Sequence, residues 1–167
     1  MGQSNRKGTI IMDDYQEILH MRVEDVEQEH VNSHPAFEFY RREFITKHGG
    51  SRVALYEVPP GKSAFPYHTH SKNEENYYIL SGEATLKTPA GERIVKAGEF
   101  LHFPTGDAGA HKITNTSESE MFVYLDFDAT DALDVCKYPD SGKIGIWGAG
   151  INRLFKLEDA VEYYEGE

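Results

Sequence analysis

Short segments with β-strand composition, separated by turn residues, fill the middle of this 167-residue sequence and constrain its fold more than any other feature. Pro and Gly gather in the turns, at residues 59–61, 81–82 and 89–92. The strands that we expect cover residues 52–58, 75–80, 83–88, 93–96, 100–103, 112–115 and 121–127. Strands that recur about every 8–12 residues with turn chemistry between them are typical of a sandwich or a barrel. The sequence therefore predicts an all-β fold.

The length of the chain indicates one domain rather than two. A chain of 167 residues suits a single hydrophobic core, and no linker or internal repeat divides it. We therefore expect an N-terminal arm packing on the barrel (1–50), a barrel core (51–128) and a C-terminal extension of the same domain (129–167).

The two ends carry weaker signals than the middle. Residues 14–31 are charged, with apolar residues at irregular spacing, and we expect a short helix or an irregular arm lying against the body. After the core, residues 128–142 have the composition of a loop. An outer strand is expected around residues 144–147, and a short helix over residues 156–164.

The charge of the chain argues against two classes of partner. The formal net charge is −11 and the sequence pI is about 5.1. Such an acidic surface repels phosphate backbones and anionic lipid head groups, so we expect neither a nucleic-acid nor a membrane partner. No apolar run approaches the length of a membrane span, and no signal-peptide pattern opens the chain. We expect a cytoplasmic protein in which Cys136, the single cysteine, is a small packed hydrophobe.

Three histidines and one glutamate carry the chemistry of this sequence. His68 and His70 are two residues apart at the start of an expected strand, so their side chains point to the same side. Glu75 begins the next strand, and alternation places its rival, Glu74, on the opposite face. His111 begins a later strand. Three imidazoles and one carboxylate that converge inside a barrel would bind one first-row divalent metal ion.

The spacing of these residues resembles the two motifs of the cupin superfamily. The first motif corresponds to Gly61-x6-His68-x-His70-x4-Glu75-x6-Gly82, and the second to Gly98-x5-Pro104-x-Gly106-x4-His111-x3-Asn115. One extra residue before His68 and two extra residues before His111 depart from the usual pattern and fall in turns. The resemblance implies a double-stranded β-helix, or jelly-roll, barrel with short terminal extensions. It also implies that the metal ligands are His68, His70, Glu75 and His111. Within the superfamily, the chain is most similar to uncharacterised single-domain bacterial cupins.

The ligand set leaves the metal and the reaction open. Four protein ligands on an octahedral ion leave two positions for substrate or dioxygen, which suits Fe, Mn or Ni, whereas Zn tends to close as a tetrahedron. We expect a metal-dependent enzyme acting on a small polar metabolite such as a sugar derivative or a hydroxy acid. The resemblance implies the dioxygenase or sugar-phosphate isomerase class. The alternative is a non-catalytic cupin that binds or senses a small molecule or a metal.

Other polar residues are weaker candidates for the pocket. An isomerase of a phosphorylated sugar needs a cation there, and alternation after His111 turns Lys112 away, while Lys87 and Arg52 stay open. Three tyrosines could bind or protonate substrate, with packing as their alternative role: Tyr67, Tyr77 and Tyr124. The remaining histidines are expected on the surface or in turns: His20, His30, His34, His48 and His102.

Both faces of the expected strand at residues 121–127 are apolar, which indicates that something covers the exterior of the barrel. The N-terminal arm is the simpler cover, and a second copy of the chain is the functional one. We expect a homodimer.

Overall fold

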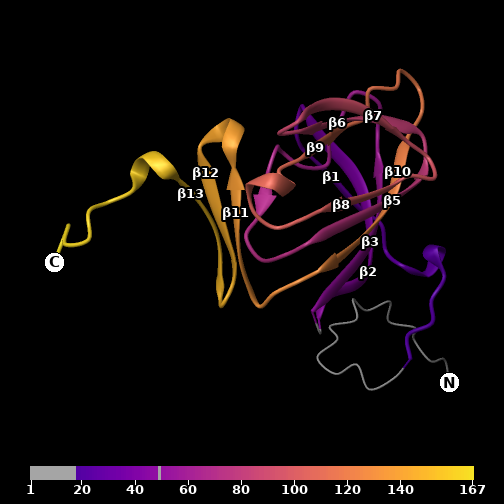
Figure 1. Ribbon diagram of the computed structural model, residues 1–167. Coiled ribbons are helices and arrows are strands. Elements are labelled where there is room, and N and C mark those ends of the chain that lie inside the picture. The colour runs from indigo at the N-terminus through magenta and orange to yellow at the C-terminus, as the bar shows by residue number, and fades with distance from the viewer. Residues whose placement is uncertain (1–17, 49) are drawn as a thin grey trace.

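The computed structural model describes residues 18–48 and 50–167 and confirms the all-β fold (Figure 1). Within these ranges the helical segments are single 3₁₀ turns: Val23–Asp25, Asp107–Gly109, Pro139–Ser141 and Leu157–Asp159. The strands are β1 (Glu29–His34), β2 (Phe37–His48), β3 (Ser51–Val58), β4 (Thr69–His70), β5 (Glu75–Ser81), β6 (Glu83–Thr88), β7 (Gly91–Lys96), β8 (Phe100–Phe103), β9 (Lys112–Thr114), β10 (Phe122–Ala129), β11 (Leu133–Tyr138), β12 (Lys143–Gly148) and β13 (Ile151–Lys156). In the described part of the chain, no helix is long and apolar enough to cross a membrane.

Two sheets enclose the barrel core. The larger sheet has the order β1-β2-β3-β10-β5-β8 and the smaller one the order β7-β6-β9. Along β3, β5 and β10, buried and partly exposed residues alternate, so every second side chain enters the core. Both sheets contribute to the same apolar cluster, with Tyr56, Tyr77 and Phe122 from the larger and Leu86 and Val95 from the smaller.

The N-terminal arm is more regular than the sequence indicated. A helix is absent from residues 18–31 apart from one 3₁₀ turn, and β1 begins at Glu29. The long strand β2 contains the aromatic residues from Phe37 onward and pairs antiparallel with β3. Pairing with β3 satisfies backbone groups of β2. As a helix, the segment before it would lack a continuous apolar stripe to pack against the body, because its apolar residues are irregularly spaced. Phe39 from this strand is buried beside Tyr56.

A third sheet, β13-β12-β11-β4, stands beside the barrel (Figure 1). The expectation of a loop through residue 142 was wrong, because β11 runs from Leu133 to Tyr138 and pairs with β4. The expected strand at residues 144–147 lies within β12. The helix expected at residues 156–164 is reduced to the turn Leu157–Asp159 after β13. The strand that pairs with β11 is β4, which lies more than 60 residues earlier in the chain. The sequence around β11 therefore gave little indication that this segment is a strand.

Candidate metal centre

Four side chains converge at one end of the barrel interior. His68, His70 and Glu75 place ligand atoms within 4.8 Å of one another. The Oε2 atom of Glu75 lies 3.5 Å from the Nε2 atoms of His68 and His70, and 3.3 Å from the Nε2 atom of His111. β4 and β5 carry His70 and Glu75, while a β-bridge between His68 and His111 joins the two chain segments. Residues from positions 68 to 111 thus meet in one cluster, and Glu74 is exposed outside it.

Each of the three histidine rings is oriented by a hydrogen bond from Nδ1. Since a carbonyl or carboxylate oxygen can only accept, Nδ1 is the donor in each case. The acceptors are the backbone oxygen of Pro66 for His68 (2.9 Å), the backbone oxygen of Gly109 for His111 (3.0 Å) and the carboxylate of Asp134 for His70. With Nδ1 as the donor, each ring presents its Nε2 atom to Glu75. An imidazole that donates from one nitrogen and faces the site with the other is arranged to bind a metal.

The residues present fit a divalent metal ion. The Oε2 atom of Glu75 and the Nε2 atom of His111 are both buried and have no hydrogen-bond partner among the described residues. Buried polar atoms without partners are costly, and a bound ion is a common reason for them. Two ligands that each lie about 2.1 Å from one ion are separated by about 3.0–3.4 Å at octahedral or tetrahedral angles, close to the distances here.

The protonation states of Glu75 and His111 suit metal binding, whereas His70 would have to lose a proton first. Burial lowers the pKa of His70, but hydrogen bonds to Asp134, Cys136 and Glu75 outweigh burial and raise it. Burial raises the pKa of Glu75, but the neighbouring charges of His111 and His68 and hydrogen bonds outweigh it, so the pKa of this carboxyl is well below its usual range. Burial lowers the pKa of His111 to about 4. At neutral pH the cluster therefore contains an ionised carboxylate and a neutral His111, and both are forms that ligate metals.

Two residues next to the cluster were missed by the sequence analysis. Asp134 is buried and bonds to His70, and the Sγ atom of Cys136 lies 3.1 Å from Nδ1 of the same ring. Both come from β11, where alternation places residues 134 and 136 on one face. Their two-residue spacing was the available signal, but a segment expected to be a loop has no defined face. Cys136 is buried, as expected.

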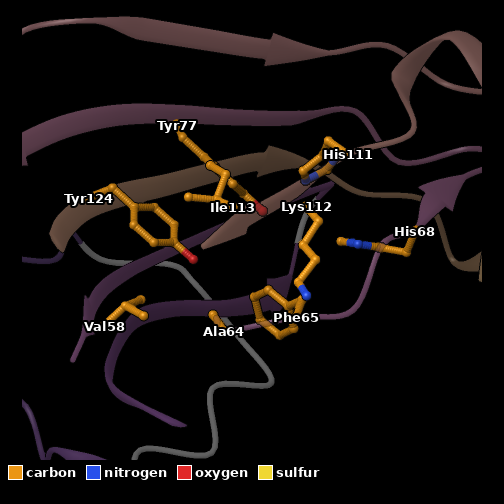
Figure 2. A pocket seen from close by; sticks show the side chains of 9 residues that line it. All are labelled: Val58, Ala64, Phe65, His68, Tyr77, His111, Lys112, Ile113 and Tyr124. Carbon is orange, nitrogen blue, oxygen red and sulfur yellow. The ribbon is translucent and has the colours of Figure 1, made fainter. Parts of the chain in front are cut away.

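A small cavity of about 10 Å³, room for about one water molecule, lies beside the cluster and is lined by two of the three candidate tyrosines (Figure 2). Tyr77 donates to Oε1 of Glu75 at 3.2 Å, whereas the hydroxyl of Tyr124 points into the cavity (Figure 2). Burial raises the pKa of both phenols. The complete lining consists of Val58, Ala64, Phe65, His68, Tyr77, His111, Lys112, Ile113 and Tyr124.

The presence of Lys112 in this lining corrects an expectation. Alternation was expected to turn its side chain away from the site, yet Lys112 lines the cavity (Figure 2), with its Nζ atom 5.4 Å from the ring centroid of Phe37. His111 precedes β9 rather than lying within it, so regular strand alternation does not apply between residues 111 and 112. The cavity therefore contains a cation, and none of the described acidic groups forms a salt bridge with it.

The other candidates lie elsewhere. Tyr67 lines a second cavity of about 430 Å³ between the barrel and the C-terminal hairpin, where the Nζ atom of Lys87 lies 4.3 Å from its ring centroid. Lys87 pairs with Asp140, and Arg52 pairs with Asp126. The histidines expected away from the metal and described with their side chains are exposed: His20, His30, His34 and His102. The side chain of His48 lies outside the described residues.

A family model described as a cupin domain matches residues 54–128. No curated protein matches the sequence. Among solved structures, a protein from Acidithiobacillus ferrooxidans, assigned provisionally as a sugar phosphate isomerase, is similar at a TM-score of 0.75 and 26% identity, over 87% of this chain and 97% of that chain.

Two further solved structures support the fold. A sugar phosphate isomerase of the cupin superfamily from Silicibacter pomeroyi has a TM-score of 0.75 at 16% identity, over 87% of this chain and 98% of that chain. A protein from Thermotoga maritima, predicted to be an oxalate decarboxylase, has a TM-score of 0.59 at 24% identity, over 68% of this chain and 100% of that chain.

Proposed function

Because residues 54–128 of this chain match the cupin-domain family, we propose that it is a metal-dependent enzyme that isomerises a small polar sugar derivative. His68, His70, Glu75 and His111 would hold one divalent ion of Fe, Mn, Ni or Zn. The observation that carries this proposal is the pair of buried, unpartnered ligand atoms, Oε2 of Glu75 and Nε2 of His111, at 3.3 Å from each other.

The residues around the ligands have separate roles in this proposal. A bound divalent ion supplies Lewis acidity to a substrate oxygen. The raised pKa of Tyr124 keeps its hydroxyl protonated at neutral pH, so it can donate a hydrogen bond to a substrate group that reaches the cavity. The Lys112 ammonium would attract an anionic substituent such as a phosphate. Tyr77 donates to Glu75 and holds that carboxylate in place.

Two observations favour an isomerase over a dioxygenase. The cavity contains the cation that a phosphorylated sugar requires, namely Lys112. In addition, the chain is 26% identical to the Acidithiobacillus ferrooxidans protein across most of both chains. Oxidation of a hydroxy acid and non-catalytic binding are the competing functions, and the assays below distinguish them.

The metal site is tested first. We expect tag-free protein to contain close to one equivalent of a first-row metal by inductively coupled plasma mass spectrometry. His70→Ala and Glu75→Ala should each lose it, because each removes a ligand. His102→Ala is the matched control, since His102 is exposed and bonds to Asn76, and it should retain the metal. Failure of the wild-type protein to take up any of the four metals would refute the proposed site.

The reaction is tested on the metal-loaded protein. Aldose and ketose phosphates should interconvert, as followed by proton NMR, and Tyr124→Phe should lower kcat by about 100-fold, the usual effect of removing one hydrogen-bond donor to the transition state. Lys112→Met should raise KM for phosphorylated substrates, whereas Lys137→Met, which lies in the second cavity, should not. Oxygen uptake with hydroxy acids would instead indicate a dioxygenase, and binding without turnover would indicate a non-catalytic protein.

A further inference from the structure

We propose that Asp134 is a positioning residue that determines which ring nitrogen of His70 faces the metal. The inference rests on the proposed metal site and assigns a role in that site to the hairpin formed by β11 and β12. β11 lies beyond residues 54–128, the part of the chain that matches the cupin domain. Part of the metal site would therefore be built by a segment outside that domain.

His70 is oriented differently from the other two histidines. His68 and His111 each donate from Nδ1 to a backbone carbonyl two residues earlier, so the local loop is sufficient to hold each ring. The acceptor for His70 is the carboxylate of Asp134, 64 residues later on another strand. That carboxylate is completely buried. The orientation of His70 therefore depends on β11 lying in register beside β4, where His70 pairs with Cys136.

The second carboxylate oxygen fixes Asp134 in place. Its Oδ1 atom accepts hydrogen bonds from the backbone N–H groups of Ser71 (3.1 Å) and Lys72 (2.8 Å). Oδ2 remains for the ring of His70. Oδ2 also accepts from the thiol of Cys136 at 3.5 Å. Because both oxygens accept, an ionised aspartate satisfies four donors, and Nδ1 of His70 must carry a proton.

This geometry makes asparagine the informative substitution. An asparagine at position 134 has one acceptor oxygen and one donor NH₂ group. The oxygen should remain with the two backbone N–H groups, because two hydrogen bonds outweigh one. The NH₂ group would then face Nδ1 of His70, which must accept, so the ring proton moves to Nε2, the atom that should ligate the metal. Asp134→Ala leaves Nδ1 with only the thiol of Cys136, 3.1 Å away, which can donate or accept weakly and so imposes neither tautomer.

The experiment measures zinc affinity and the tautomer of His70 separately. Zn²⁺ binding is measured by competition with a chromophoric chelator for the wild-type protein, Asp134→Asn, Asp134→Ala and Cys136→Ala. Proton–nitrogen NMR of the ring nitrogens, with and without Zn²⁺, reports the proton on Nδ1 of His70, assigned through its absence in His70→Gln. The corresponding protons of His68 and His111 are internal references.

We expect Asp134→Asn to weaken zinc binding by about 100-fold and Asp134→Ala by about 10-fold, the range found for residues that orient a ligand. The Nδ1 proton of His70 should disappear in Asp134→Asn while those of His68 and His111 remain. Cys136→Ala should weaken zinc binding by less than Asp134→Ala and keep the proton, because it leaves the aspartate bond in place. An unchanged Nδ1 proton and unchanged affinity in Asp134→Asn would overturn the inference.

Two further outcomes are decisive. If the wild-type protein binds no Zn²⁺, the proposed metal site fails, but the NMR spectrum of the metal-free protein still tests the effect of Asp134 on His70. If Asp134→Asn does not fold, the zinc affinity and the Nδ1 proton of His70 are measured in Asp134→Ala instead. A full Nδ1 proton in folded Asp134→Ala, with affinity equal to the wild type, would contradict a positioning role.

Discussion

At the scale of single residues, one arginine supports a group of buried acids in the barrel. Arg52 donates to Asp126 at 2.9 Å and to Asp128 at 3.5 Å, and it also bonds to the hydroxyl of Tyr56. Burial raises the pKa of both Asp126 and Asp128. Removing one partner from a buried ion pair is strongly destabilising, because it leaves an uncompensated charge.

Replacing this arginine should therefore lower stability more than replacing an exposed one. We expect Arg52→Met to lower the free energy of unfolding by about 3 kcal/mol at neutral pH, measured by urea unfolding with Trp147 fluorescence. Arg153→Met is the control, since Arg153 is exposed on β13, and its effect should be within about 0.5 kcal/mol. Adding Asp126→Asn to Arg52→Met should restore part of the loss. Equal effects of the two arginine variants would contradict this account.

The stability loss should also depend on pH. An aspartate whose pKa is raised by folding binds its proton more tightly in the folded chain, so its contribution is greatest below the ordinary pKa of about 3.9 and is lost as pH rises through the folded pKa. Without Arg52, the pKa values of Asp126 and Asp128 should rise further. The difference in unfolding free energy between Arg52→Met and the wild type should therefore be larger at about pH 8 than at about pH 5. A difference that is constant between these pH values would argue against these carboxylates.

At the scale of elements, the β11–β12 hairpin depends on a glycine at its end. Gly148 has a φ of +115°, and a Cβ there would lie 2.0 Å from the carbonyl oxygen of Ala132. The obstructing atoms belong to the backbone, so no side-chain rotation relieves the contact. The same hairpin carries Asp134, so a distortion at its end should reach the candidate metal site.

Comparing alanine variants of Gly148 and Gly91 separates the steric effect of the added methyl group from the strain of the backbone conformation. Gly91 has a φ of +114°, but a Cβ there meets nothing within 4 Å. Gly91→Ala should cost about 1–2 kcal/mol from its backbone conformation alone. Gly148→Ala should cost at least about 2 kcal/mol more and should speed hydrogen exchange in β11. Equal losses in thermal and urea unfolding would show that the hairpin end relaxes around the methyl group.

At the scale of the whole molecule, one face of the larger sheet is apolar and is left uncovered by residues 18–48 and 50–167. Its outward side chains include Tyr78, Leu80 and Phe100, which are 42%, 48% and 55% exposed. Leu125 pairs in register with Tyr78, and Tyr78 with Phe100, so these side chains form a continuous surface. The arm at residues 29–48 continues the sheet as β1 and β2 rather than lying across this face. We propose that a second copy of the chain covers it, since an exposed apolar surface of this kind marks an interaction site and most oligomers pair identical chains.

The proposed dimer is tested by light scattering after gel filtration. The wild-type protein should have about twice the 18.9 kDa mass of one chain. The double variant Leu80→Arg/Phe100→Arg should have the mass of a monomer, because it buries unpaired charge in the interface. Ile94→Arg is the control, since Ile94 is 50% exposed but lies on β7 of the smaller sheet. A monomeric wild-type protein at the highest concentration tested would refute the dimer.

Much of the barrel could be predicted from sequence because its signals are local. Alternation brings His68 and His70 to one side and separates Glu75 from Glu74, and turn residues mark where strands end. These effects act between residues close in the chain. For that reason the all-β fold could be expected before any contact was known, whereas the grouping of His111 with the other three candidate ligands was implied by the resemblance to the cupin motifs.

The C-terminal half of the site was decided only by tertiary structure. The β11 sequence alternates apolar and polar residues weakly, and its pairing with β4 joins residues more than 60 positions apart. Lys112 likewise follows the irregular turn before β9 rather than strand alternation. Such distant contacts stabilise the fold only once the two segments have come together, so the sequence of either segment alone does not reveal them. By itself the sequence determined the strands and the candidate ligands, whereas folding determined that Asp134 orients His70 and that Lys112 lines the cavity.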